Sequence, residues 1–128
     1  MAGRPKRRAR QNSDLAQYRD KLQQLIESGD PELIEQAVEL SKATGSRGLW
    51  AQDMSFKPYL QFPPDFDLSF ADFSLSSFRQ SSWYDTYLPG AKFREAEFRR
   101  MKVYRSSLER ADFSQAHLEW TRFGICQI

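Results

Sequence analysis

The chain has 128 residues with 19 basic and 17 acidic side chains, a net charge of +2, and enough hydrophobic residues (40%) for one compact unit with an appendage. Its single histidine and single cysteine exclude a histidine-based metal cluster, a histidine-containing catalytic triad and an intramolecular disulfide within one chain. No glycine-rich phosphate loop is present either. The sequence therefore predicts a protein that is not an enzyme and uses no cofactor, metal or small-molecule substrate.

The sequence shows neither a membrane span nor an export signal. No apolar run approaches the roughly 20 residues that cross a bilayer, and no apolar signal segment follows the basic N-terminus. The lone Cys126 is expected to be a packed thiol rather than a reactive one. These features predict a cytoplasmic protein without membrane contact.

Residues 1–12 form a basic segment that we expect to be disordered on its own, because it combines positive charge with few apolar side chains. The candidate nucleic-acid-binding residues here are Arg4, Lys6, Arg7, Arg8 and Arg10. Gly3-Arg4-Pro5 and the three basic residues after it resemble an AT-hook, which implies an extended arm in the minor groove of A·T-rich DNA. The alternatives are a solvated tail, a general RNA or polyanion anchor, and a nuclear localisation signal.

Residues 13–45 predict two helices that pack as an antiparallel hairpin. The first helix is expected to start at Asn12 or Ser13, and the second at Asp30 as N-cap with Pro31 in the first position. The second helix ends near Gly45 and is net acidic, which disfavours a DNA-reading helix-turn-helix because phosphate would repel it. We expect the hairpin to cap one end of the fold. Residues 46–65 are too apolar for a free linker, and we expect them to fold over the same end as an irregular plug.

From Phe66 to Ile128 the sequence repeats every five residues. The first residue of a unit is Ala, Ser, Thr or Cys in eleven of thirteen units. A period of five fits neither a helix nor a strand and is typical of a solenoid. The third residue is always large and apolar: Leu68, Phe73, Phe78, Trp83, Leu88, Phe93, Phe98, Val103, Leu108, Phe113, Leu118, Phe123 and Ile128.

Units such as ADFSL (71–75) and ADFSQ (111–115) match A-(D/N)-L-x-x, so residues 66–128 resemble the pentapeptide-repeat family. The resemblance implies a mainly β fold: a right-handed quadrilateral β-solenoid with twenty residues per coil, about three coils and the third residue pointing inward. The sequence supports this, because residues twenty apart are alike, as in Phe73, Phe93 and Phe113. The predicted fold is this solenoid behind an α-helical hairpin cap.

Two outer faces of the solenoid are expected to collect basic residues with interleaved Tyr84 and Tyr104, as phosphate and base contacts would need. A merely solvated face is the alternative. The candidates are Arg79, Arg99, Arg100, Lys102, Arg105 and Arg122. On another face, Asp72, Lys92 and Asp112 predict a ladder of alternating charge that stabilises the stack.

Trp120, Ile125 and Ile128 lie on the last coil with no polar cap after them. We expect a second copy of the chain or a protein partner to bury this coil.

Two functions follow. The first is a binding protein that associates with nucleic acid, DNA or RNA, through its basic segment and presents a rigid solenoid face as an accessory or scaffold. The alternative is a protein–protein interaction module or an inhibitor of a DNA-handling enzyme. Quinolone-resistance members of the family resemble DNA and bind gyrase, but the neutral solenoid predicted here lacks the acidic columns of a DNA mimic.

Overall fold

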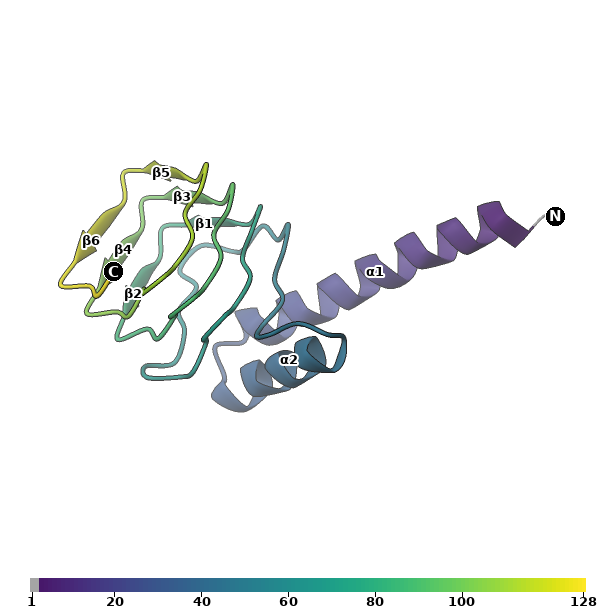
Figure 1. Cartoon of the computed structure of the whole chain (residues 1–128), viewed down its shortest axis with the longest axis horizontal. Coiled ribbons are helices and arrows are strands. Elements are labelled where there is room, and N and C mark those ends of the chain that lie inside the picture. Colours follow the sequence, from purple (N-terminus) through teal and green to yellow (C-terminus); the bar gives the residue numbers. More distant parts are fainter. Residues whose placement is uncertain (1–2) are drawn as a thin grey trace.

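The computed structural model describes the backbone of residues 3–128 and the side chains of residues 14–128. Two helices precede a stack of coils, and the N-terminal part of the first helix projects away from that stack (Figure 1). The elements are α1 (Gly3–Glu27), α2 (Pro31–Ala43), β1 (Ser77–Arg79), β2 (Ser82–Tyr84), β3 (Glu97–Arg99), β4 (Lys102–Tyr104), β5 (His117–Glu119) and β6 (Arg122–Gly124).

The first helix starts earlier than the sequence predicted. α1 begins at Gly3 rather than at Asn12 or Ser13, so residues 3–12 are helical where a disordered segment was expected. The alanine, arginine, lysine and glutamine of this segment are good helix formers. Pro5 lies in the first turn, where its missing N–H has no intrahelical partner to lose. The extended arm of an AT-hook is therefore not the conformation of these residues.

The second helix has the boundaries that its sequence predicted. Asp30 is the N-cap and accepts a 2.9 Å hydrogen bond from the Glu32 N–H, and Pro31 is the first helical residue. The helix ends at Ala43 with Thr44 as its C-cap, and Gly45 follows with a φ of 101°. Asp30 and Gly45 thus fix the length of α2.

The helical hairpin covers one end of the coils with its apolar faces. Leu22 and Ile26 of α1 and Ile34 of α2 are fully buried in the same hydrophobic cluster as the interior of the coils. Ser41 joins the hairpin to the next segment, because its hydroxyl accepts a 2.9 Å hydrogen bond from the Trp50 N–H. The hairpin therefore has the position of a solenoid cap.

Residues 49–65 are a first coil rather than an irregular plug. The Ala51 N–H donates to the Asp72 carbonyl at 2.8 Å, and the Phe56 N–H donates to the Ser77 carbonyl at 3.0 Å. The parallel bridges Trp50–Asp72 and Ser55–Ser77 join residues 22 apart, two more than in the coils that follow. These two extra residues break the five-residue period, which is why the repeat pattern did not reveal this coil.

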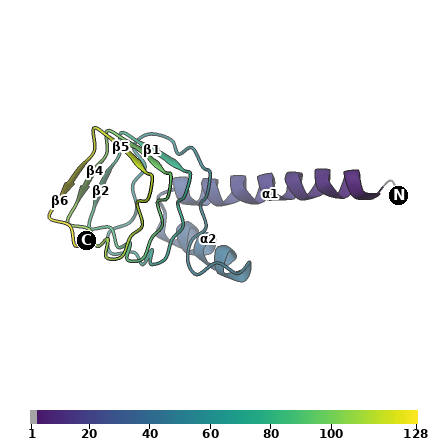
Figure 2. The ribbon, with the colours of Figure 1, turned by 45° about the horizontal axis from the view of Figure 1, so that its top comes forward.

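Residues 66–128 stack as coils with a period of twenty residues. β1, β3 and β5 form one parallel ladder, and β2, β4 and β6 form a second. Two further ladders consist of single bridges, one through Asp72 and Lys92 and one through Asp67 and Tyr87. All partners in these four ladders are twenty residues apart, as the repeat predicted, and Figure 2 shows the successive coils one behind another.

Aromatic rings fill the interior of the coils. The third-position side chains from Leu68 to Leu108 are at most 1% exposed, and the small first-position residues beside them are buried as well. On the last coil the cover is incomplete, since Leu118 is 46% and Ile128 is 81% exposed. The interior pattern predicted from the sequence is therefore confirmed up to the coil that ends the stack.

The chain turns at every fifth residue through a left-handed backbone conformation. From Phe70 to Ile125 each fifth position has a φ between 50° and 69°, and only Gly90 among them is a glycine. Non-glycine residues adopt this conformation at a cost of about 1–2 kcal/mol each. The corners are thus imposed by the ladders and the packed interior, and not by glycine in the sequence.

Candidate nucleic-acid interface

The two strand ladders meet at one corner of the solenoid. β1, β3 and β5 run into this corner, and β2, β4 and β6 leave it. The fifth-position residues between them are Gln80, Arg100 and Trp120, one on each of three successive coils. Backbone bonds hold them in register, because the Gln80 N–H donates to the Arg99 carbonyl and the Arg100 N–H donates to the Glu119 carbonyl, both at 2.9 Å.

Basic side chains from both ladders gather at this corner, and all of them are exposed. Arg79 is the register partner of Arg99, and Lys102 is the register partner of Arg122. Partners in a ladder lie about 4.8 Å apart, a separation at which like charges oppose the stability of the sheet. We call the following five residues the corner strip: Arg79, Arg99, Arg100, Lys102 and Arg122.

Most of the corner strip has no neutralising carboxylate. Arg99 makes an ion pair with Glu119, with 3.8 Å between Nε and Oε2. Among the side chains of residues 14–128, the other four members of the strip make no ion pair within 4.0 Å. The one pair is largely exposed and therefore worth little. An anion placed along the corner would relieve the repulsion between the stacked cations.

Shallow grooves follow the strip along the corner. The first is lined by Arg79, Gln80, Arg99 and Arg100. The second lies on the last coils and is lined by Arg100, Met101, Lys102, Leu118, Trp120, Thr121 and Arg122. Because both grooves share Arg100, a ligand could pass from one to the other without leaving the strip.

The structure sets Arg105 apart from the other predicted residues. Its Nη2 lies 3.4 Å from the Asp85 carboxylate, and its guanidinium lies 5.7 Å from the centre of the Tyr84 ring. Tyr84 and Tyr104 stack on each other at 5.7 Å, and Tyr104 also covers Gly124. These two aromatic side chains stack between neighbouring coils at the C-terminal ends of β2 and β4, and the guanidinium that lies over Tyr84 is that of Arg105.

The sequence assigned Trp120 to the uncapped end and did not connect it with the basic residues. In the structure its indole is 77% exposed and lines the second groove beside three cations. A signal was present in the period of twenty, because Trp120 follows Arg100 in the same column. Arg4, Lys6, Arg7, Arg8 and Arg10 lie in the helical part of the backbone, but their side chains are outside the described residues.

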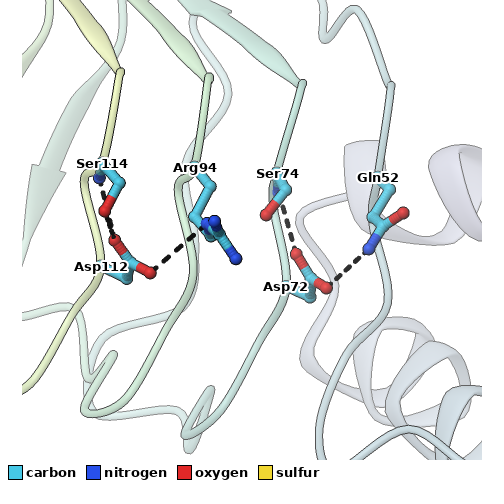
Figure 3. A network of polar contacts seen from close by, with 6 residues as sticks. All are labelled: Gln52, Asp72, Ser74, Arg94, Asp112 and Ser114. Carbon is cyan, nitrogen blue, oxygen red and sulfur yellow. Dashed lines mark hydrogen bonds and ion pairs between the residues drawn. The ribbon is translucent and has the colours of Figure 1, made fainter.

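Another face carries carboxylates that are held by serines (Figure 3). Asp72 accepts a hydrogen bond from the Ser74 N–H at 3.0 Å, and Asp112 accepts one from the Ser114 N–H at 2.9 Å. The Ser114 hydroxyl also donates a hydrogen bond to Asp112. This bond is the main cause of a lowered pKa of the Asp112 carboxyl, and the bond from the Ser114 N–H is the second cause. Each aspartate is the first residue of an Asp-x-Ser sequence, in which its side chain accepts the serine N–H and closes a local turn.

The predicted stack of Asp72, Lys92 and Asp112 is present in the backbone ladder, but the close ion pairs of this face involve other side chains. Asp112 pairs with Arg94 at 3.6 Å, and Asp72 accepts a 2.7 Å hydrogen bond from the Gln52 side chain. Lys92 is the backbone neighbour of both aspartates but makes no ion pair within 4.0 Å in residues 14–128. The serine turns, rather than the lysine, therefore position these carboxylates.

Three other features bear on chemistry in the described part of the chain. The half-buried Cys126 thiol lies 3.3 Å from the Val103 carbonyl, as a packed thiol would. No group of three histidine, cysteine or acidic side chains that could hold a metal is found among the described residues. No helix within residues 3–128 is both long and apolar enough to cross a membrane.

The family model for pentapeptide repeats matches residues 71–110 and 91–124, with 8 copies of the repeat. Together with the parallel ladders at a period of twenty, this match shows that residues 71–124 consist of pentapeptide repeats. No curated protein and no solved structure matches the chain. The family points to a structural or protein-interaction module.

Proposed function

We propose that this protein is a non-enzymatic binding protein that associates with nucleic acid, and that its right-handed quadrilateral β-helix serves as a rigid accessory or scaffold. The observation that carries the proposal is the corner strip, whose cations are stacked on successive coils with a single exposed ion pair. Such a surface favours contact with a polyanion over exposure to solvent, because phosphates would offset the repulsion between the stacked cations. The cytoplasmic location stays a prediction from the sequence.

A second basic element supports this function. The basic residues from Arg4 to Arg10 lie in the first turns of α1, the part of the helix that projects from the cap (Figure 1). The 25 residues of α1 correspond to about 37 Å of helix, so its tip reaches well beyond the solenoid. The positive end of the helix dipole adds to the charge of these residues. The corner strip and the helix tip could contact one nucleic acid at two separated places.

Deletion of residues 1–11 is expected to weaken DNA binding and its dependence on salt. If all five basic residues contact duplex phosphates, the log–log slope of affinity against salt should fall in magnitude by about 4.5. Binding is measured by fluorescence anisotropy over a salt series. Thermal unfolding checks that the cap is intact, since Leu22 and Ile26 of α1, which are buried against the coils, are retained. An unchanged affinity and slope would contradict a role for the helix tip.

A protein-interaction function is favoured by the last coil. Trp120, Ile125 and Ile128 are 77%, 85% and 81% exposed, and β5 and β6 are edge strands with unpaired backbone groups. We propose that a second copy or a protein partner covers this coil. An inhibitor of a DNA-handling enzyme belongs to this class of function, without the acidic columns of a DNA mimic.

Sedimentation equilibrium of the full chain tests self-association through this coil. We expect the mean mass to rise with protein concentration, and we expect Ile125→Lys to shift that rise to concentrations at least ten times higher. Leu75→Lys is the control, because it also replaces an exposed apolar residue at a fifth position by lysine, on a coil away from the open end. A monomeric mass at every concentration, with nothing else bound, would overturn self-association.

A further inference from the structure

Trp120 is unusually placed for a large apolar side chain. It stands on a corner whose other members are Gln80 and Arg100, and it is 77% exposed in a left-handed backbone conformation with a φ of 52°. Exposed aromatic side chains that border a charged groove are typical of binding sites. The Trp120 ring and the cations of the second groove therefore form one surface.

Resting on the nucleic-acid binding proposed above, we infer that the corner strip takes single-stranded nucleic acid. One base stacks on the Trp120 ring, and the adjoining phosphates contact Arg100, Lys102 and Arg122, which line the same groove. The backbone then continues along the first groove toward Arg79 and Arg99. Stacking platforms beside a cationic track are the recurring means by which proteins bind single strands without sequence selection.

The shape of the site favours a single strand over a duplex. In a duplex the faces of the bases stack on one another, so an exposed indole at a corner finds no free face to contact. The strip spans three coils, or about 10 Å along the solenoid, which suits a few consecutive phosphates of one strand. A duplex would meet the cations but would leave Trp120 without a role.

The charge of the groove also argues against burial of Trp120 in a symmetric contact between two copies. In such a contact the same patch faces itself, so Arg100, Lys102 and Arg122 of each copy would meet like charges. Ile125 and Ile128 lie outside this groove and carry no such penalty. The two apolar surfaces of the last coil are thus separable, and Trp120 belongs to the polyanion site.

The test uses the full chain with an oligothymidylate of about 12 nucleotides and with the same strand annealed to its complement. Tryptophan fluorescence reports on stacking, because Trp83 is only 1% exposed and Trp50 is packed against Tyr18, which leaves Trp120 as the accessible ring. Anisotropy of a labelled strand gives the affinity. We expect the single strand to quench the fluorescence and to bind more tightly than the duplex at equal salt.

Variants separate stacking from charge. Trp120→Leu is expected to lower single-strand affinity about tenfold and to leave duplex affinity unchanged, whereas Trp120→Phe keeps most of the affinity because it keeps a ring. Arg100→Gln should lower the salt slope for the single strand by about 0.7. Arg110→Gln is its matched control, since Arg110 is exposed, occupies the same fifth position and lies two units further along the chain, on another corner.

Each outcome decides a specific point. Equal binding of strand and duplex, with no effect of Trp120→Leu, overturns the single-strand inference and leaves nucleic-acid binding in place. No binding of either probe to the full chain removes the proposed function itself. Competition by polyglutamate at the same charge concentration, with no quenching by the oligonucleotide, would assign the strip to an acidic protein segment and overturn the inference. Unfolding of Trp120→Leu would show in circular dichroism, and the Phe variant and Arg100→Gln would then decide.

Discussion

Replacement of Phe93 by alanine is expected to lower the free energy of unfolding by about 3–5 kcal/mol, the usual cost of removing a buried phenyl ring. Phe93 is fully buried on the middle coil of its column. Its ring stacks on Phe73 at 5.4 Å and on Phe113 at 4.9 Å, with interplanar angles of 14° and 8°. The neighbouring coils are fixed by backbone ladders, so the cavity left by the ring cannot collapse easily.

Urea unfolding followed by circular dichroism measures this loss. Phe93→Leu is the first control and should cost clearly less, because leucine occupies the same kind of column at Leu88 and Leu108. Phe113→Ala is the second control, because this ring is only half-buried on the last coil. If Phe93→Ala cost no more than Phe113→Ala, the stacked column would not be the main support of the solenoid.

The sequence predicted the solenoid well because its repeat constrains backbone and interior at once. A large apolar third residue and a small first residue leave one way to fill a coil of twenty residues, and the ladders of the structure have that period. The cap of α2 was also predictable, because Asp30, Pro31 and Gly45 each act through the local backbone. Periodic packing and local helix capping can both be predicted from a single sequence, because each depends on residues at fixed spacing along the chain.

Two parts of the fold could not be predicted in the same way. Residues 49–65 form a coil through hydrogen bonds to residues 72 to 85, and those bonds depend on the neighbouring coil rather than on a local pattern. The start of α1 at Gly3 depends on a balance between helix propensity and charge repulsion within the basic segment. The first case depends on contacts with a neighbouring coil, and the second depends on two opposing effects within one segment. Composition alone therefore predicted an irregular plug and a disordered segment in place of a coil and a helix.

For the candidate site, the sequence identified the cations but not their grouping. The period of twenty placed Arg79 over Arg99, as the structure has it. Whether a cation is paired depends on side-chain geometry, which separates Arg105, beside Asp85, from Arg100, which lines both grooves. Trp120 was missed because its apolar character suggested an interface, although its column is polar.

Gly48→Ala is expected to loosen the junction between the helical cap and the solenoid, at a cost of about 3 kcal/mol or somewhat more. A Cβ atom on Gly48 would lie 2.4 Å from the Ser69 carbonyl oxygen and 2.9 Å from the carbonyl carbon and oxygen of Phe70. These are backbone atoms of a coil held by its ladder, since the Phe70 N–H donates to the Pro89 carbonyl at 2.9 Å. They cannot move aside without breaking hydrogen bonds of the first repeat.

Gly124→Ala provides the matched comparison, because its Cβ would also meet a close neighbour, at 2.2 Å, but that neighbour is the ring of Tyr104. The Tyr104 side chain is only half-buried and can rotate toward solvent, so this variant should cost about 1 kcal/mol or less. Hydrogen exchange should show increased opening of α2 in Gly48→Ala and unchanged protection of β3 and β4, because the cap would separate before the ladders do. Equal destabilisation by the two substitutions would contradict this prediction. It would mean that the backbone at Ser69 and Phe70 moves as easily as the Tyr104 ring, and that the cap is not held rigidly against the solenoid.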